Sequence, residues 1–312
     1  MPAILNVQRQ RVDKESLANP WLPGLEVFRV GNRVGESPVW DDTLQALLWI
    51  DIRAPELLML TPDDLELTRW RLDALPGAIG LGRPGQVVMT LGAQVVTFDL
   101  NRALFSVLAS IPGEPPGNRM NDGKVSPSGR WFVFGSMDDS AHPKSPTGAL
   151  YCVGADAVVR RLAAGLVVTN GIAWNPAGDC LYFSDSDRGT VWTSSWDEEA
   201  GGMGTPRRFA SSRGSQGRPD GALVTSDGDY LSAGVSAGCL NRFDRNGRLL
   251  NRVPMPCRAP TMPCYGGRAL EHLYITSLVR PGWVGSQSPS YDGDLFRFKA
   301  SRAGDVGPRF RV

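Results

Sequence analysis

The 312-residue sequence has only two histidines and five cysteines, and no two cysteines are spaced as CxxC. The scattered cysteines predict neither a disulfide framework nor a zinc knuckle. His142 and His272 do not fall on the repeated positions described below, which argues against a histidine-ligated zinc centre and against a histidine general base. Carboxylate and amide side chains are therefore the candidates for any metal or acid–base chemistry.

Charge of one sign is also lacking, because 33 basic side chains are balanced by 32 acidic ones and the net charge is +1. Such a balance gives no field that would gather nucleic acid or an anionic membrane surface. No run approaches the ~20 apolar residues of a membrane span, and residues 1–16 lack the apolar stretch of a signal peptide. We therefore expect a cytoplasmic protein with a small-molecule ligand and no nucleic-acid, membrane or protein partner.

Sustained helical periodicity is absent. Short runs of alternating or β-branched residues recur instead, among them LEVFRV, ALLWIDI, WFVFGSM and HLYITSL. Between such runs lie turn sequences such as SPSG, NPAG and DRNG, which favour hairpins. The sequence predicts a protein that is nearly all β.

These strands belong to a repeated unit, in which a polar or small residue precedes a strand, a turn and a second, aromatic-rich strand. The clearest copies are ESPVWDDTLQALLWIDI, NDGKVSPSGRWFVFGSM, TNGIAWNPAGDCLYFSDS and PDGALVTSDGDYLSAG. Their leading residues, with those of two weaker copies, are Glu36, Ala78, Asn121, Asn170, Asp220 and Thr261. Six copies at intervals of 41 to 50 residues predict a six-bladed β-propeller formed by residues 1–312 as a single domain. The surplus N-terminal strand LEVFRV is expected to close the last blade beside DLFRFKA.

The leading residues open the innermost strands in this register, so they are expected to meet at one end of the central channel. Two are carboxylates and two are amides, which are the oxygen donors that hard cations prefer. The small residues Ala78 and Thr261 would leave space for a ligand beside the cation. The sequence thus predicts a divalent-metal site at the mouth of the channel.

The repeated segments resemble the senescence marker protein 30/regucalcin and gluconolactonase family of sugar lactonases. The similarity is carried, in family order, by GESPVW with WIDI, RMNDGKVSPSGRWFVFGSM, TNGIAWNPAGDCLYFSDS, RPDGALVTSDGDYLSAG and PTMPCYGGRALEHLYITS. It covers nearly the whole chain after about residue 25. The resemblance implies metal-dependent hydrolysis of an aldonic-acid sugar lactone, of the gluconolactone, xylonolactone or arabinonolactone type.

The resemblance also implies roles for individual residues. Glu36, Asn170 and Asp220 match the family's metal ligands, and Asp220 matches the general base that activates water while the metal polarises the carbonyl. Arg119 and Asn121 match positions that hold the sugar lactone. Asp139 matches a position where some relatives use Glu, although Asp138 could serve instead. The implied cofactor is one divalent ion, Ca²⁺ or Zn²⁺ first, with Mn²⁺, Mg²⁺ and Fe²⁺ as further options.

Three short motifs suggest other activities but lack the required context. GxGxxG at 80–85 precedes a strand run instead of opening a helix, which argues against dinucleotide binding and dehydrogenase activity. GxSxG at 234–238 lies between strands, whereas a nucleophile elbow joins a strand to a helix. Asp185-Ser186-Asp187 resembles the start of an EF-hand loop without its later glycine and glutamate.

Two alternatives to a sugar lactonase remain open. One is a metal-dependent esterase or phosphotriesterase of propeller fold, in which the metal would polarise a phosphoryl oxygen or an unrelated ester. The other is a non-enzymatic calcium-binding propeller, which would need the oxygen donors but no substrate contact. The turn-forming pairs Asp220-Gly221 and Asn121-Asp122 are moreover compatible with a purely structural role.

Overall fold

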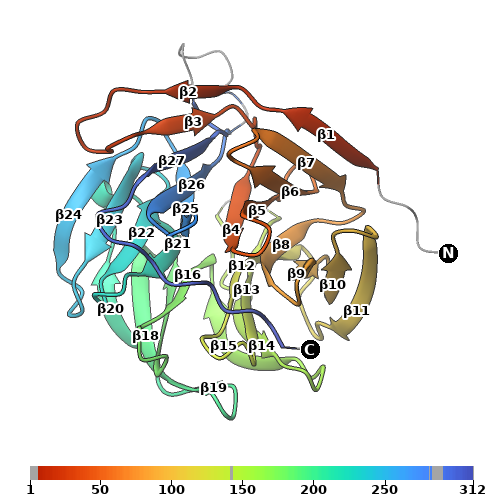
Figure 1. The fold of residues 1–312 in the computed structure, drawn as a ribbon. Coiled ribbons are helices and arrows are strands. Elements are labelled where there is room, and N and C mark those ends of the chain that lie inside the picture. Colours follow the sequence, from red (N-terminus) through yellow and green to blue (C-terminus); the bar gives the residue numbers. More distant parts are fainter. Residues whose placement is uncertain (1–5, 141–142, 281, 283–290, 312) are drawn as a thin grey trace.

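The computed structural model describes residues 6–140, 143–280, 282 and 291–311. Within these ranges the regular structure is almost entirely strand, and the one helical element is the short 3₁₀ turn η1 (Gly214–Gln216). The strands form six separate antiparallel sheets arranged radially (Figure 1). The prediction of an all-β, six-bladed propeller is confirmed.

Blades 1 to 3 are built from consecutive strands, each blade beginning at the channel and ending at the rim. Blade 1 contains β4 (Gly35–Asp41), β5 (Ala46–Asp51), β6 (Glu56–Thr61) and β7 (Glu66–Arg71), with β1 (Val7–Arg11) added outside β7. Blade 2 contains β8 (Pro76–Leu81), β9 (Gln86–Leu91), β10 (Gln94–Asp99) and β11 (Leu104–Ser110). Blade 3 contains β12 (Asn118–Val125), β13 (Phe132–Asp138), β14 (Gly148–Val153) and β15 (Arg160–Leu166).

Blades 4 to 6 repeat this order, and blades 4 and 6 have additional strands at their outer edges. Blade 4 contains β16 (Thr169–Trp174), β17 (Cys180–Asp185), β18 (Thr190–Asp197), β19 (Gly202–Met203) and β20 (Arg207–Ser211). Blade 5 contains β21 (Pro219–Val224), β22 (Tyr230–Gly234), β23 (Cys239–Phe243) and β24 (Leu249–Pro254). Blade 6 contains β25 (Pro260–Gly266), β26 (His272–Ser277), β27 (Leu295–Lys299), β3 (Glu26–Phe28) and β2 (Lys14–Ser16).

The innermost strands β4, β8, β12, β16, β21 and β25 form a closed ring. Each contacts the next along the chain, and β25 contacts β4 to complete the circle. Residues of β4 and β25, separated by more than two hundred positions, are therefore neighbours in the ring. This ring is the part of the fold that positions the site.

The hydrophobic core lies between neighbouring blades rather than at the centre of the molecule. The buried apolar residues of the described chain fall into six clusters, one at each interface between adjacent blades. Both faces of a blade are therefore covered, which explains why strands such as ALLWID are buried at every residue. Such packing holds the innermost strands in fixed positions around the channel.

Both ends of the chain contribute to blade 6. The N-terminal strand β3 pairs with β27, with Phe28 opposite Leu295 and Val27 opposite Phe296. The segment after β27 then crosses the face of the propeller toward blades 2 and 3 (Figure 1). There the backbone N–H of Phe310 donates to the carbonyl of Leu81 at 2.7 Å, and the Phe310 side chain is 1% exposed.

The motifs that suggested other activities form ordinary strand ends and turns. Residues 80–85 are the end of β8 and the turn to β9, and residues 234–238 join β22 to β23. Neither motif is followed by a helix, so neither has the geometry of a dinucleotide fingerprint or a nucleophile elbow. The described part of the chain also contains no helix with the length and apolar character of a membrane span.

Candidate metal and substrate site

All six predicted site residues line one cavity at the mouth of the channel. The cavity has a volume of about 770 Å³, and its walls include Glu36, Arg119, Asn121, Asp139, Asn170 and Asp220. These side chains come from blades 1, 3, 4 and 5, as the repeat requires. The fold therefore brings the predicted residues together, while their roles as ligands, base and substrate contacts stay predictions.

A break in strand pairing accompanies the leading residues. Each of the six innermost strands carries a register shift against its neighbour at this level of the channel. In three of them the residue after the leading one has a positive φ: 53° at Ser37, 50° at Asp122 and 63° at Gly171. A bulge redirects nearby side chains, and strained backbone of this kind is frequent at functional sites. The bulges are thus a structural reason why oxygen donors converge here.

Two buried carboxylates dominate the electrostatics of the cavity. Glu36 and Asp220 are each 6% exposed. Burial, followed by repulsion from Asp220 and Asp122, raises the pKa of Glu36 well above its usual range. Burial, followed by repulsion from Asp122, raises the pKa of Asp220 to about 7. A cation bound between the two would relieve both the repulsion and the loss of hydration.

Asp122 is buried beside these groups, but its carboxylate is hydrogen-bonded to backbone N–H groups. Its oxygens accept hydrogen bonds from the N–H groups of Gly123 at 2.7 Å and Ile172 at 3.1 Å. Asp122 therefore connects β12 to β16 across a blade interface. The prediction of a structural role for part of the NDG segment fits this residue better than it fits Asn121.

The amide of Asn170 supplies the third donor. Its nitrogen donates to the hydroxyl of Ser186 at 2.8 Å, and Ser186 in turn donates to the carbonyl of Pro219 at 2.6 Å. The amide oxygen is buried and has no hydrogen-bond partner among the described residues. Because an unpaired buried oxygen is costly, this atom fits a metal ligand that is fixed in orientation by Ser186.

The donor set favours a hard cation. No group of three or more His, Cys, Asp or Glu side chains in the described ranges is arranged to hold a metal. Coordination by protein side chains would therefore combine the Glu36 and Asp220 carboxylates with the Asn170 amide oxygen. Carboxylate and carbonyl oxygens suit Ca²⁺, Mg²⁺ and Mn²⁺, and zinc also binds carboxylate oxygen. The residues present fit a divalent ion.

Arg119 connects the donor ring to the wall of the cavity. Its guanidinium donates to the Asn121 side-chain oxygen at 2.7 Å and to the Asp139 carboxylate at 3.2 Å. The Asn121 nitrogen donates to the carbonyl of Thr169 at 2.8 Å. Asn121 is therefore held in one orientation from both ends of its amide. Arg119 and Asn121 form a rigid polar pair beside the two carboxylates.

Of the two adjacent aspartates, Asp139 is the one that faces the cavity. It accepts hydrogen bonds from Arg53 and Arg119; burial alone would raise its pKa, but these bonds and charges hold it below the usual range. Asp138 instead accepts from the backbone N–H groups of Ser140 and Ser145 at 2.9 and 2.8 Å. Asp138 thus stabilises its own loop.

Ala78 and Thr261 do not line the cavity, contrary to the expectation that they leave ligand space there. Both are fully buried. The backbone N–H of Ala78 donates to the Thr90 hydroxyl at 3.0 Å, and the Thr261 hydroxyl donates to the carbonyl of Gly35 at 2.5 Å. In these two blades the leading position serves packing and strand pairing.

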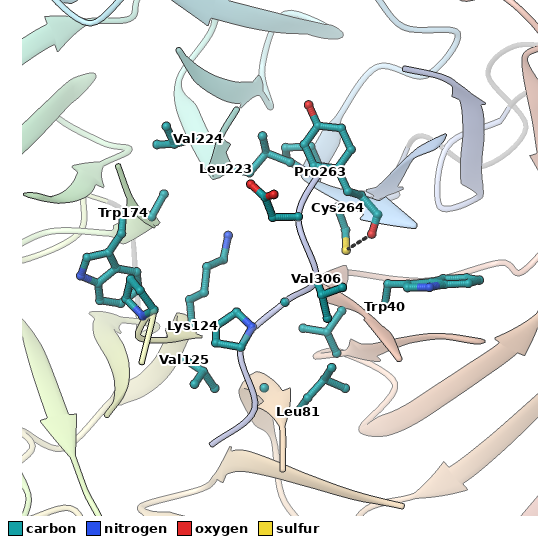
Figure 2. Close-up of a pocket in the computed structure, with 18 of the residues that line it drawn as sticks. Trp40, Leu81, Lys124, Val125, Trp174, Leu223, Val224, Pro263, Cys264 and Val306 are labelled. Carbon is teal, nitrogen blue, oxygen red and sulfur yellow. Dashed lines mark hydrogen bonds between the residues drawn. The ribbon is translucent and has the colours of Figure 1, made fainter. Parts of the chain in front are cut away.

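A second cavity, of about 300 Å³, lies farther along the innermost strands (Figure 2). Its walls are mostly apolar, and Val306 of the C-terminal segment lies against it. Lys124 extends into it, and its ammonium donates to the carbonyl of Ala222 at 2.6 Å. None of the predicted site residues reaches this cavity.

Comparison with known proteins gives the family. The model of the SMP-30/Gluconolactonase/LRE-like region matches residues 34–279, which is more than three quarters of the chain and includes all six predicted site residues. The chain belongs to this family. The resemblance found in its repeated segments is confirmed.

Relatives within the SMP-30/gluconolactonase/LRE-like family are similar along most of the chain. A 6-deoxy-6-sulfogluconolactonase of Pseudomonas putida is 35% identical over 255 residues, covering 80% of this chain and 85% of the relative. Human regucalcin is 29% identical over 248 residues, covering 78% and 83%. The crystal structure of a calcium-binding protein, regucalcin, from Agrobacterium tumefaciens superposes with a TM-score of 0.84 at 23% identity, covering 91% and 95% of the two chains.

Sequence reasoning missed much of the cavity wall of this family member. Arg53, Lys144 and Arg280 line the cavity from loops, and loop direction cannot be read from the repeat. Arg218 could have been found, because it lies two residues before Asp220 as Arg119 lies two before Asn121. Side chains two apart in extended chain share a face, and Arg218 lies immediately before β21. The repeat itself therefore carried the signal for Arg218.

Proposed function

We propose that this protein hydrolyses an aldonic-acid sugar lactone to the free acid, with Glu36, Asn170 and Asp220 holding one divalent metal ion such as Ca²⁺ or Zn²⁺. The observation that carries the proposal is the unpartnered, buried amide oxygen of Asn170 in the same cavity as two carboxylates with raised pKa values. Membership of the family and the lactonase name of the Pseudomonas putida relative support the reaction class.

A divalent ion held by these three residues would supply a Lewis acid for the lactone carbonyl. Asp220 would act as the general base, because its carboxylate lies in the same cavity as the other two predicted ligands and could accept the proton of a water attacking beside the ion. The water oxygen bonds to the carbonyl carbon, and the ring C–O bond then breaks. The proton taken by Asp220 returns to the departing alkoxide, which leaves a hydroxy acid.

Arg119 and Asn121 would hold the sugar. Their mutual hydrogen bond and the bond from Asn121 to Thr169 fix both groups before the substrate binds. Hydroxyl groups on the lactone can accept from the guanidinium and exchange hydrogen bonds with the amide. Preorganised contacts of this kind place the carbonyl for attack at little entropic cost during the reaction.

A panel of substrates tests the proposed reaction. Gluconolactone, xylonolactone and arabinonolactone would be compared with an aryl ester and a phosphotriester, each with the metal-loaded protein. We expect acid release from at least one sugar lactone and little turnover of the other two classes. Turnover confined to the phosphotriester or aryl ester, or metal binding with no hydrolysis at all, would overturn the proposal in favour of an esterase or a calcium-binding propeller.

A further inference from the structure

The cavity of the candidate site has an excess of positive charge. The described residues of its walls include three carboxylates, those of Glu36, Asp139 and Asp220, and six cationic side chains. The cationic residues are Arg33, Arg53, Arg119, Lys144, Arg218 and Arg280. The whole chain has a net charge of only +1, so this excess is local. A cleft with an excess of one sign of charge concentrates ligands of the opposite sign, and this long-range attraction acts on an anionic lactone but not on a neutral one.

Three of the cations gather around one carboxylate. Arg53 and Arg119 both donate to the Asp139 carboxylate. Lys144 lines the same cavity and lies beside this group, since its ammonium hydrogen-bonds to the backbone of the preceding residue, Asp138. Asp139 alone therefore cannot neutralise the three positive charges around it.

The charge of the adjacent Asp138 also acts on Lys144, but two carboxylates still leave one of the three positive charges unbalanced. The Asp138 carboxylate accepts from Ser140 and Ser145, so that it faces its own loop. Lys144 instead donates to the backbone carbonyl of Asp138 at 2.7 Å. An ammonium has three N–H donors, and this carbonyl is the one acceptor that the described residues provide for Lys144.

This cationic group is physically continuous with the predicted sugar site. The Arg119 guanidinium contacts Asp139 on one side and the Asn121 side chain on the other. A lactone held by Asn121 would therefore direct part of its structure past Arg119 toward Lys144. On the other side, Arg218 and Arg280 lie close enough to Asp220 to influence it electrostatically, where the carboxylate product would form.

We propose that the preferred substrate is a sugar lactone with an anionic substituent, bound by Lys144 and Arg53 at the end of the sugar remote from the lactone carbonyl. This inference rests on the proposed lactonase function and adds the substrate class. Sulfonate, phosphate and carboxylate groups share the required chemistry, since each presents several oxygens to ammonium and guanidinium donors. Such a group would balance the positive charge that Asp138 and Asp139 leave uncompensated.

Kinetics with paired substrates tests this substrate class. The kcat/KM values of gluconolactone and of its 6-sulfonate and 6-phosphate derivatives would be measured for the native protein, K144Q and K144R. Because the anionic substituent would accept charge-assisted hydrogen bonds, we expect kcat/KM for the anionic lactones to exceed that for gluconolactone about ten- to a hundredfold in the native protein. K144Q should lower this ratio about tenfold or more, and K144R should retain most of it.

Lys299 provides a matched control. It is an exposed lysine on β27 that does not line the cavity, so K299Q should leave the ratio of anionic to neutral kcat/KM unchanged. Raising the salt concentration should lower the ratio in the native protein, since charges at a solvent-accessible mouth are screened. Equal kcat/KM values for neutral and anionic lactones, or a ratio that K144Q does not change, would overturn the inference while leaving the lactonase function intact.

A binding measurement separates the substrate class from the reaction. Sorbitol and sorbitol 6-phosphate have no lactone carbonyl, and their affinities can be compared by calorimetry with the native protein and K144Q. We expect the phosphate to bind about tenfold or more tightly than sorbitol, with the difference largely lost in K144Q. Such a result without lactone hydrolysis would overturn the proposed function alone, whereas equal affinities would overturn the anionic subsite.

Discussion

Three side-chain groups are the proposed metal ligands: the amide oxygen of Asn170 and the carboxylates of Glu36 and Asp220. They come from three blades, and all are more than nine-tenths buried. Their convergence on one cavity was predictable, because the repeat aligns all three at the start of an innermost strand, whereas their choice as ligands came from the family resemblance and stays a prediction. Their environment was not predictable, since the pKa values are raised first by burial, which depends on the closed ring, and then by repulsion between neighbouring carboxylates, Asp122 among them.

Two substitutions should separate chemistry from substrate binding. D220N should depress kcat by about a hundredfold or more, because it removes the proton acceptor. R119A should lower kcat/KM by about ten- to a hundredfold through the loss of a charge-assisted hydrogen bond, with little change in metal affinity. Metal affinity by calorimetry and kinetics on both variants check this. Loss of the metal in R119A, or near-normal kcat in metal-loaded D220N, would contradict the assigned roles.

Metal binding should depend on pH in a defined direction. Because the pKa of Asp220 is raised to about 7, the metal-free protein keeps a proton there at lower pH, and a bound cation must displace it. Affinity should therefore fall by about tenfold per pH unit below pH 7, and more steeply if Glu36 is also protonated. D220N should reduce the number of protons released on metal binding by about one. Calorimetry in buffers of different ionisation enthalpy measures the proton release, and a flat profile between pH 5 and 7 would refute it.

At the scale of strands, the bulges decide which side chains reach the cavity. The sequence predicted the innermost strands and the register that brings four leading residues together. It did not predict that Ala78 and Thr261 lie buried outside the cavity, because a bulge changes local direction without changing the repeat. The contacts made by loops were not predicted either. One of them, between Arg53 and Asp139, joins blade 1 to blade 3.

Gly171 provides a test of the bulge in β16. Its φ is +63°, and a Cβ there would collide with the Tyr230 hydroxyl and meet the Ser184 hydroxyl oxygen at 2.8 Å. G171A should lower the free energy of unfolding by more than the ~1–2 kcal/mol of left-handed strain alone, and should weaken metal binding by displacing Asn170.

The control for this substitution is G165A. Gly165 has a φ of +77° but open space where its Cβ would lie, so this variant should show the backbone strain alone and normal metal affinity. Urea denaturation and metal titration of the two variants provide the comparison. Equal effects of G171A and G165A on both properties would mean that the bulge does not position Asn170.

At the scale of the whole molecule, the ring is closed by both ends of the chain. The pairing of β3 with β27 places Phe28, which is fully buried, in the cluster between blades 6 and 1. The radial architecture was predictable because six repeats cannot bury their faces except against one another. That the 312 residues form a single domain stays a prediction, which the cooperativity of unfolding can test.

Loss of the closing contact should destabilise the entire ring. F28A should lower the free energy of unfolding by about 3–5 kcal/mol, because it creates a cavity between blades. V7A, in the outermost strand β1 where the side chain is 41% exposed, should change it by less than about 0.5 kcal/mol. Circular dichroism and tryptophan fluorescence should report one coincident transition in the native protein. Two separate transitions would contradict a single domain.

The central claim is that Glu36, Asn170 and Asp220 hold one divalent ion that lactone hydrolysis requires. The most direct measurement is a titration of chelator-treated protein with Ca²⁺ and, separately, Zn²⁺, following acid release from a sugar lactone that the native protein hydrolyses. The account predicts negligible activity without metal, recovery that saturates at one ion per chain, and no comparable recovery in E36Q. Full activity in the metal-free protein, or equal recovery in E36Q at one ion per chain, would contradict it.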